Sequence, residues 1–122
     1  MSAKILVVED NPQNRLLVAD LLRWHGYEVL EARDGEEGIR LAREHLPNLI
    51  LMDIQMPLLS GLEAARTLRS DPLTAHIKIV AVTSMAMKGD REKIVEVGLD
   101  DYIPKPVDTR RLPVLIREVL ER

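Results

Sequence analysis

The chain has 122 residues, a normal size for one domain with a single core, and 46% of them are apolar and 30% charged, as in ordinary globular proteins. Its net charge of −3 gives no reason to expect binding to nucleic acid, which needs basic patches. The absence of cysteine excludes disulfides, thiolate metal sites and a cysteine nucleophile, and no apolar run approaches the roughly 20 residues of a membrane helix. We expect a cytoplasmic protein with one domain over residues 1–122, which binds neither nucleic acid nor membranes.

The first predicted element is a buried strand over Lys4–Val8, a short apolar run that includes β-branched residues. It ends at the polar turn Glu9–Asn11, and Pro12 follows at a position where a helix can begin. Either of the last two residues of that turn could cap the helix, which we expect over Asn14–His25, with Gly26 ending it. The apolar side chains that should face the core are Leu17, Val18, Leu21 and Leu22.

The second predicted strand, Tyr27–Ala32, contains two glutamates, which indicates a position at the edge of the sheet. Asp34-Gly35 forms a turn. A second helix is expected over Glu36–Leu46, because acidic residues in its first turn suit the helix dipole and Pro47 closes it.

The third strand, Asn48–Asp53, begins as an apolar run without alternation, which is typical of a strand buried on both faces of a parallel sheet. It ends on the carboxylate of Asp53, and the chain breaks at Pro57. A charge at the carboxyl end of such a strand lies where open α/β sheets bind their ligands. Aspartate also caps turns, however, and Asp53 alone does not distinguish the two roles.

A third helix is expected after Ser60, which has Glu63 three positions on in the spacing of a capping box, and it should end near Ser70. The fourth strand, Ile77–Val82, follows. A fourth helix should then run to Val97 and stop at the glycine after it, with an apolar loop or first turn before it.

A very short fifth strand, Tyr102-Ile103, precedes Lys105-Pro106 and the last helix, for which Asp108 is a candidate N-cap. Pro113 would be the fifth residue of a helix that began there and would forfeit a backbone hydrogen bond, so we expect a distortion or a later start. The apolar repeat of this helix is the cleanest in the chain and consists of Leu112, Leu115, Ile116, Val119 and Leu120.

Five successive strand–helix pairs predict an α/β fold, a doubly wound five-stranded parallel sheet with helices on both faces. In the flavodoxin-like strand order 2-1-3-4-5, the first and third strands are neighbours, and polar residues at the strand ends meet at one edge of the sheet. The residues that would meet there are Glu9, Asp10, Asp53, Thr83 and Lys105.

Clustered carboxylates need a compensating charge, because two of them about 4 Å apart repel by roughly 4 kcal/mol at an effective dielectric constant of 20. Lys105 can balance one charge, and Mg²⁺ bound by carboxylates and water is the usual way to balance the others. Zinc is disfavoured because neither cysteine nor histidine stands at these strand ends. An aspartate carboxylate can itself be the nucleophile, so the pattern predicts Mg²⁺-dependent phosphoryl chemistry at Asp53.

Over essentially its whole length the chain resembles the receiver domains of response regulators in two-component signalling, which have the CheY-like fold. The resemblance implies that Glu9, Asp10 and Asp53 hold Mg²⁺ and that Asp53 is the phosphoacceptor. It also implies that the backbone carbonyl of Gln55 completes the metal shell. Met56-Pro57 and the later Gly61 match the loop after the phosphoacceptor strand.

Further matches follow the later strands. Thr83, with the small Ser84 next to it, matches the switch hydroxyl of the family, and Tyr102 matches the switch aromatic residue. Lys105-Pro106 matches a Lys-Pro pair whose peptide bond is cis in this family. The resemblance implies that the Thr83 hydroxyl moves onto the phosphoryl group and that Tyr102 then turns inward.

The function that this resemblance implies is regulatory. A histidine kinase or a histidine phosphotransfer protein would donate the phosphoryl group, and the protein would catalyse only its own phosphorylation and dephosphorylation, with the Gln55 side chain tuning the latter. A downstream protein target would read the face formed by the fourth helix, fifth strand and fifth helix. We expect a monomer or weak homodimer without an output domain, closest in pattern to DivK-like single-domain regulators and the receivers of hybrid kinases.

Three other functions fit parts of the pattern. An Mg²⁺-dependent hydrolase with an aspartate nucleophile normally has a second aspartate two positions on, where this chain has Gln55. A flavin-binding module needs a phosphate-cradling loop after the first strand, where Glu9 and Asp10 would repel a phosphate. A receiver that is never phosphorylated would not need the complete set of site residues. Outside this pattern we expect partial packing of Trp24 and surface positions for His25, His45 and His76.

Overall fold

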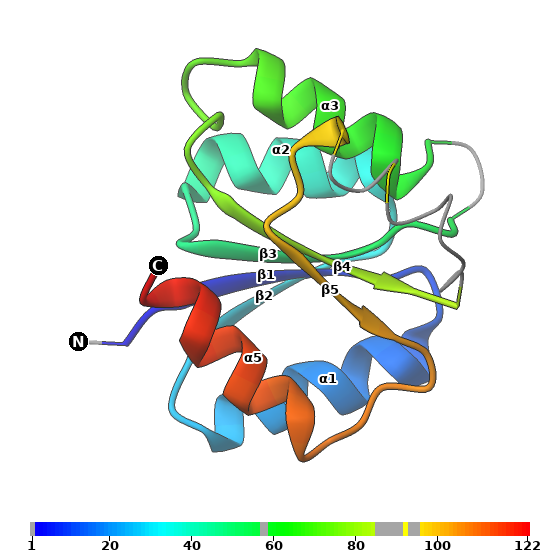
Figure 1. Ribbon diagram of the computed structural model, residues 1–122, viewed down its shortest axis with the longest axis vertical. Coiled ribbons are helices and arrows are strands. Elements are labelled where there is room, and N and C mark those ends of the chain that lie inside the picture. Colours follow the sequence, from blue (N-terminus) through cyan, green and yellow to red (C-terminus); the bar gives the residue numbers. More distant parts are fainter. Residues whose placement is uncertain (1, 57–58, 85–91, 93–95) are drawn as a thin grey trace.

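The protein is built around a parallel five-stranded sheet in the order β2-β1-β3-β4-β5, as predicted (Figure 1). The computed structural model describes residues 2–56, 59–84, 92 and 96–122. The strands are β1 (Lys4–Val8), β2 (Glu28–Ala32), β3 (Leu49–Asp53), β4 (Lys78–Thr83) and β5 (Asp101–Pro104). None differs from its predicted range by more than one residue at either end.

The register of the sheet brings the carboxyl ends of the strands to one edge. Val8 at the end of β1 pairs with Ala32 of β2 on one side and with Met52 of β3 on the other. All five residues of β3 are buried, whereas β2 at the edge of the sheet is mostly half-buried or exposed. This difference explains the sequence pattern, because the strand buried on both faces is uninterrupted by charge until its last residue.

Helices cover both faces of the sheet (Figure 1). The helices are α1 (Pro12–Trp24), α2 (Gly35–His45), α3 (Gly61–Ser70) and α5 (Arg111–Leu120). Two aliphatic clusters form the core, one between the sheet and the α2–α3 layer, the other between the sheet and the α1–α5 layer. Within the described part of the chain, none of the helices is both long and apolar enough to span a bilayer.

Side-chain caps fix the starts of three helices. Asn11 Oδ1 accepts hydrogen bonds from the N–H groups of the two residues after Pro12, at 2.9 and 3.0 Å, so it is the cap of α1. Asp34 caps α2 through the Glu37 N–H at 2.8 Å. Ser60 caps α3 through the N–H of Glu63 at 3.2 Å, as its capping-box spacing predicted. Each cap satisfies donors that have no partner within the helix.

The last helix starts later than the candidate cap Asp108 suggests. Asp108 Oδ1 accepts hydrogen bonds from the N–H groups of Arg110 and Arg111 at 2.8 and 3.3 Å, but the helix itself begins at Arg111. Pro113 is therefore its third residue, within the first turn, where no backbone hydrogen bond is lost. The predicted later start is confirmed, and the buried residues Leu112, Leu115, Ile116 and Val119 belong to the predicted repeat.

Two predictions about α1 are wrong. Leu17 was expected in the core but is 55% exposed, and the buried side chains of the helix are those of Val18, Ala19 and Leu22. Trp24 was expected to be partly packed but is 85% exposed at the end of the helix.

Most of the predicted fourth helix and its first turn, residues 85–91 and 93–95, lies outside the described residues.

Arg69 of α3 forms hydrogen bonds to the segment just before β5. Its guanidinium donates to the carbonyl oxygen of Gly98 at 3.0 Å and to Asp100 Oδ2 at 2.9 Å. The same carboxylate oxygen accepts the N–H of Ile79 in β4 at 2.7 Å.

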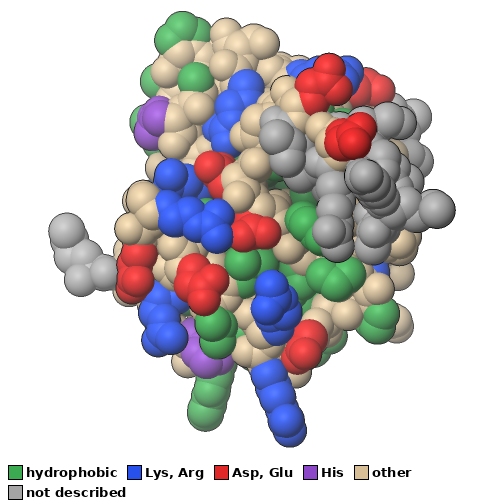
Figure 2. Space-filling view, in the orientation of Figure 1, with side chains coloured by type: hydrophobic (Ala, Val, Ile, Leu, Met, Phe, Trp, Pro, Cys, Tyr) green, Lys and Arg blue, Asp and Glu red, His purple; other side chains and the backbone are tan. Residues whose placement is uncertain are grey.

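On the face in Figure 2, Lys and Arg side chains lie next to Asp and Glu side chains, so charges of both signs are interspersed there.

Candidate functional site

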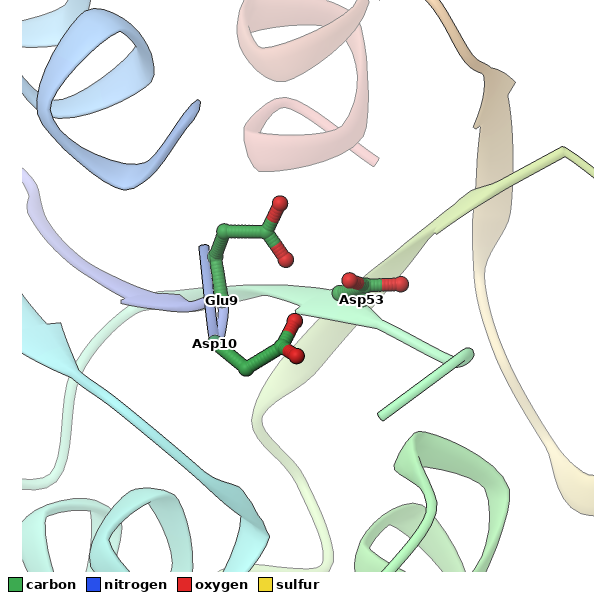
Figure 3. A group of neighbouring side chains, drawn as sticks. All are labelled: Glu9, Asp10 and Asp53. Atoms are coloured by element: carbon green, nitrogen blue, oxygen red, sulfur yellow. The ribbon is translucent and has the colours of Figure 1, made fainter. Parts of the chain in front are cut away.

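Three carboxylates converge where β1 and β3 end. Glu9 and Asp10 follow the last residue of β1, and Asp53 is the last residue of β3. Because these strands are neighbours in the sheet, one oxygen from each carboxylate lies within 4.8 Å of the others. Figure 3 shows the three side chains turned toward a common space. The predicted meeting of the acids at the strand ends is therefore present in the structure.

Asp53 is almost completely buried, with 2% of its surface exposed. Its Oδ1 accepts the backbone N–H of Gln55 at 2.9 Å, and its Oδ2 accepts the ammonium of Lys105 at 2.9 Å. One oxygen thus caps the turn after β3, while the other forms an ion pair across the strand ends. The turn cap is therefore present in the structure, and the functional role of Asp53 stays a prediction.

The pKa values of the neighbouring carboxyl groups of Glu9 and Asp53 are shifted in opposite directions. Burial and the neighbouring Asp53 raise the pKa of Glu9 from 4.5 to about 8, so at neutral pH without a cation it retains a proton. Burial alone would also raise the pKa of Asp53, but hydrogen bonds from Glu9, Gln55 and Lys105 outweigh it and lower the pKa of Asp53 below its usual range. Asp53 is therefore the anion of the pair.

The donor set fits a hard divalent cation. Glu9 Oε2 is buried and has no hydrogen-bond partner among the described residues, an arrangement that costs free energy unless a proton or cation compensates it. The Asp10 side chain is exposed and can reach the same space without a desolvation cost. An all-oxygen set of this kind suits Mg²⁺ or a similar cation, which would replace the proton on Glu9.

Thr83 and Lys105 lie at the same edge of the sheet. Thr83 is the last residue of β4 and is fully buried. The backbone N–H of Lys105 donates to the carbonyl oxygen of Thr83 at 2.8 Å, which places the lysine beside the end of β4. The peptide bond between Lys105 and Pro106 is cis, as the resemblance implied.

Comparison with known proteins decides the family. The model of the response regulator receiver domain matches residues 5–117. The chain is 46% identical over 120 residues to a polar-differentiation response regulator DivK from Brucella ovis, and the match covers 98% of each chain. The chain belongs to the response-regulator receiver family.

Solved receiver structures have the same fold. The receiver domain of sensor histidine kinase PA1611 from Pseudomonas aeruginosa, with a magnesium ion in its active site cleft, matches with a TM-score of 0.91 at 34% identity, over 100% of both chains. The chemotaxis protein CheY4 of Vibrio cholerae matches with a TM-score of 0.93 at 27% identity, over 98% of this chain and 99% of that chain. The CheY-like fold and the function of a two-component response regulator are thereby confirmed.

The remaining residues that the receiver pattern singled out are also near this edge. Tyr102 of β5 is half-buried and packs against the core cluster under α2 and α3. Gln55 is exposed, two residues after Asp53, and its Oε1 accepts two hydrogen bonds from Ser84, at 2.8 Å from the N–H and 2.7 Å from the hydroxyl. The metal-ligand role of the Gln55 backbone carbonyl stays a prediction.

The first helix contributes to the receiver site in a way that we did not expect from the sequence. A cavity of about 480 Å³ opens beside Asp53 and Lys105, and Asn14 and Leu17 of α1 line it together with Val107. We had assigned Leu17 to the core because it fits the helical repeat. The only sequence signal for its position is that α1 begins directly after the acidic pair, so its second turn lies close to the strand ends.

Without divalent cations, the receiver should lose stability as the pH rises toward 8. Between pH 4.5 and about 8 the folded protein keeps a proton on Glu9 that the unfolded chain releases. This stabilisation is fully present below pH 4.5 and is lost as the pH rises through about 8, at a rate of at most about 1.4 kcal/mol per pH unit. Urea denaturation in EDTA, followed from about pH 5.5 to about pH 7.5, measures the loss.

The matched variant for this measurement is Glu9→Gln, which keeps the side-chain shape but cannot titrate. Its free energy of unfolding should change less over the same pH range. The three exposed histidines, His25, His45 and His76, are present in both proteins, so their contribution cancels. Equal pH slopes for the wild type and the variant would contradict the proposed proton on Glu9.

Proposed function

We propose that the protein accepts a phosphoryl group on Asp53 from the phosphohistidine of a histidine kinase or a histidine phosphotransfer protein. The observation that carries this proposal is the environment of Asp53. Its carboxylate lies at the end of a fully buried strand, within 2.9 Å of the Lys105 ammonium and beside two further acids. The lowered pKa of Asp53 keeps the nucleophile ionised.

The reaction is a transfer between two nucleophiles. An oxygen of Asp53 forms a bond to phosphorus, the bond from phosphorus to the imidazole nitrogen breaks, and its electron pair stays on the nitrogen. The product is an acyl phosphate on Asp53. Lys105 contacts the carboxylate at 2.9 Å and can stabilise the negative charge that spreads onto the phosphoryl oxygens.

Glu9, Asp10 and Asp53, with the backbone carbonyl of Gln55, would hold Mg²⁺ in this site. When bound, the ion neutralises charge on the carboxylates and on the transferred phosphoryl oxygens. The unpartnered buried oxygen of Glu9 supports this assignment, and so does the magnesium-bound Pseudomonas receiver. Water and this site would later hydrolyse the acyl phosphate, so the protein would catalyse only its own phosphorylation and dephosphorylation.

The signal would leave the site through Thr83 and Tyr102. Thr83 is buried at the end of β4 and Tyr102 lies one strand further, half-buried on β5. A phosphoryl group adds charge that favours a second arrangement of these side chains, and a downstream protein would recognise the changed face formed by the fourth predicted helix, β5 and α5. We propose that the protein acts there as a monomer or weak homodimer.

Removal of divalent cations should abolish phosphorylation of the protein. With acetyl phosphate as donor, a phosphorylated species should form in Mg²⁺ and fall to the level of a sample without donor in EDTA, because the carboxylates then repel the incoming phosphoryl group. Phosphate-affinity electrophoresis measures the phosphorylated fraction. Excess Mg²⁺ added after EDTA should restore it. Labelling that persists in EDTA would be inconsistent with the metal-dependent mechanism.

A further inference from the structure

The side chain of Gln55 connects the ends of β3 and β4 beyond their ladder. A backbone hydrogen bond between these segments runs from the N–H of Ile54 to the carbonyl oxygen of Val82, at 3.1 Å. One residue after Ile54 and two residues after Val82, Gln55 Oε1 accepts both donors of Ser84, its N–H at 2.8 Å and its hydroxyl at 2.7 Å. One amide oxygen thus occupies both donors of the residue that follows Thr83.

One partner of this connection, Ser84, lines the cavity beside the proposed phosphoacceptor. Ser84, Asp53 and Lys105 line the same cavity of about 480 Å³. The Ser84 N–H and hydroxyl are therefore within the space where a group attached to Asp53 would need hydrogen-bond donors. In the structure those donors are already occupied, and the side chain that occupies them is anchored only two residues from Asp53.

A phosphoryl group and the Gln55 amide would compete for Ser84. Phosphoryl oxygens are charged acceptors, and hydrogen bonds to them are roughly twice as strong as those to a neutral amide. Phosphorylation of Asp53 would therefore draw Ser84 away from Gln55. Conversely, while the two hydrogen bonds to Gln55 persist, the N–H and hydroxyl of Ser84 cannot donate to a phosphoryl group on Asp53.

We propose that the Gln55 side chain is a clasp that closes the unphosphorylated site by holding Ser84, and that this clasp must open before Asp53 can be phosphorylated. The proposal rests on the proposed function of Asp53 and adds to it a positioning residue that sets the rate. Only the fraction of molecules with an open clasp reacts, so the observed rate is the intrinsic rate multiplied by that fraction. Because Ser84 is adjacent to Thr83, opening also frees the segment that carries the switch hydroxyl.

Removing the clasp should accelerate phosphorylation. Exposed neutral hydrogen bonds shift an equilibrium by about three- to tenfold, so Gln55→Ala should be phosphorylated by acetyl phosphate about three- to tenfold faster than the wild type. Gln55→Asn should behave similarly, because its shorter side chain cannot span the distance to Ser84. Both variants keep the Gln55 backbone carbonyl. An unchanged or lower rate for Gln55→Ala would overturn the proposal.

A double-mutant cycle separates the clasp from independent effects at the two positions. Ser84→Ala removes the hydroxyl and keeps the N–H, so its rate should rise less than that of Gln55→Ala. The double variant should be no faster than Gln55→Ala alone, because the clasp is already absent. Rates that multiply across the two substitutions would show that the residues act separately and would contradict the clasp.

Amide hydrogen exchange tests the clasp without phosphorylation. The Ser84 N–H should be protected in the wild type and exchange faster in Gln55→Ala. The N–H of residue 55, which donates to Asp53 Oδ1 at 2.9 Å, should stay protected in both proteins and is the internal control. Rapid exchange at Ser84 in the wild type would overturn the clasp even if Asp53 is phosphorylated. Failure of every phosphodonor would instead overturn the proposed function and leave this exchange result intact.

Discussion

Asp53→Asn should not be phosphorylated by acetyl phosphate in Mg²⁺, and its signal should not exceed that of a sample without donor. The substitution replaces a buried carboxylate by a carboxamide, which lacks the anionic oxygen that attacks phosphorus. It also removes the negative charge that pairs with Lys105 at 2.9 Å and that would bind the cation beside Glu9 and Asp10. Intact-protein mass spectrometry over a time course measures the loss.

Folding of the Asp53→Asn variant should be preserved. The carboxamide oxygen can still accept the N–H of Gln55, and the substitution removes one of the three clustered carboxylates. Circular dichroism and thermal melting therefore separate loss of the phosphoacceptor from loss of structure. The matched control is Asp20→Asn on the exposed surface of α1, where the carboxylate is 64% exposed. This control should be labelled like the wild type, and equal labelling of the Asp53 variant would exclude Asp53 as the acceptor.

Gly61→Ala should destabilise the protein strongly and disturb the site at the same time. A Cβ at this first position of α3 would press on the carbonyl oxygen of Asp53 and lie 2.5 Å from Ile54 Cα. Both are backbone atoms, so relief requires movement of the end of β3 and of the carboxylate that it carries. We expect a loss of about 2–3 kcal/mol in the free energy of unfolding or more, as for overpacked core positions, together with slower phosphorylation.

Gly26→Ala is the control that isolates the steric part of this effect. Gly26 has a φ of +89°, so an alanine there adopts a strained left-handed conformation, but its Cβ would have no atom within 4 Å. The expected cost is about 1–2 kcal/mol, and Gly26 precedes the amino end of β2, away from the carboxyl ends of the strands, so phosphorylation should proceed as in the wild type. Urea denaturation gives both values. A Gly61 variant as stable and as reactive as the wild type would contradict the close packing of α3 on Asp53.

The sheet and the set of polar strand ends could be predicted because each depends on short-range sequence signals. The apolar run before Asp53 is uninterrupted since β3 is buried on both faces, and the glutamates of β2 mark the edge strand. Once the strand order is fixed, residues that directly follow the strands must lie at the same edge. Glu9, Asp10, Asp53 and Lys105 therefore meet, although their spacing in the sequence varies widely.

The parts that could not be predicted depend on side-chain contacts between distant segments. Leu17 fits the helical repeat of the core residues, yet it is 55% exposed and lines the cavity beside Asp53. The exposure of Trp24 could not be predicted from the apolar repeat either. A repeat identifies which face of a helix is buried, but it does not show where along the helix the packing against other elements ends. The bonds between Gln55 and Ser84 require the actual distance between two loops.

The most direct test of the phosphoacceptor assignment is chemical trapping of the acyl phosphate. Borohydride reduces an aspartyl phosphate to homoserine, which peptide mass spectrometry can locate in the chain. After treatment with acetyl phosphate and Mg²⁺, homoserine should be found at position 53, and EDTA should abolish it. Homoserine at another aspartate, or phosphate on His25, His45 or His76, with position 53 unmodified, would contradict the central role of Asp53.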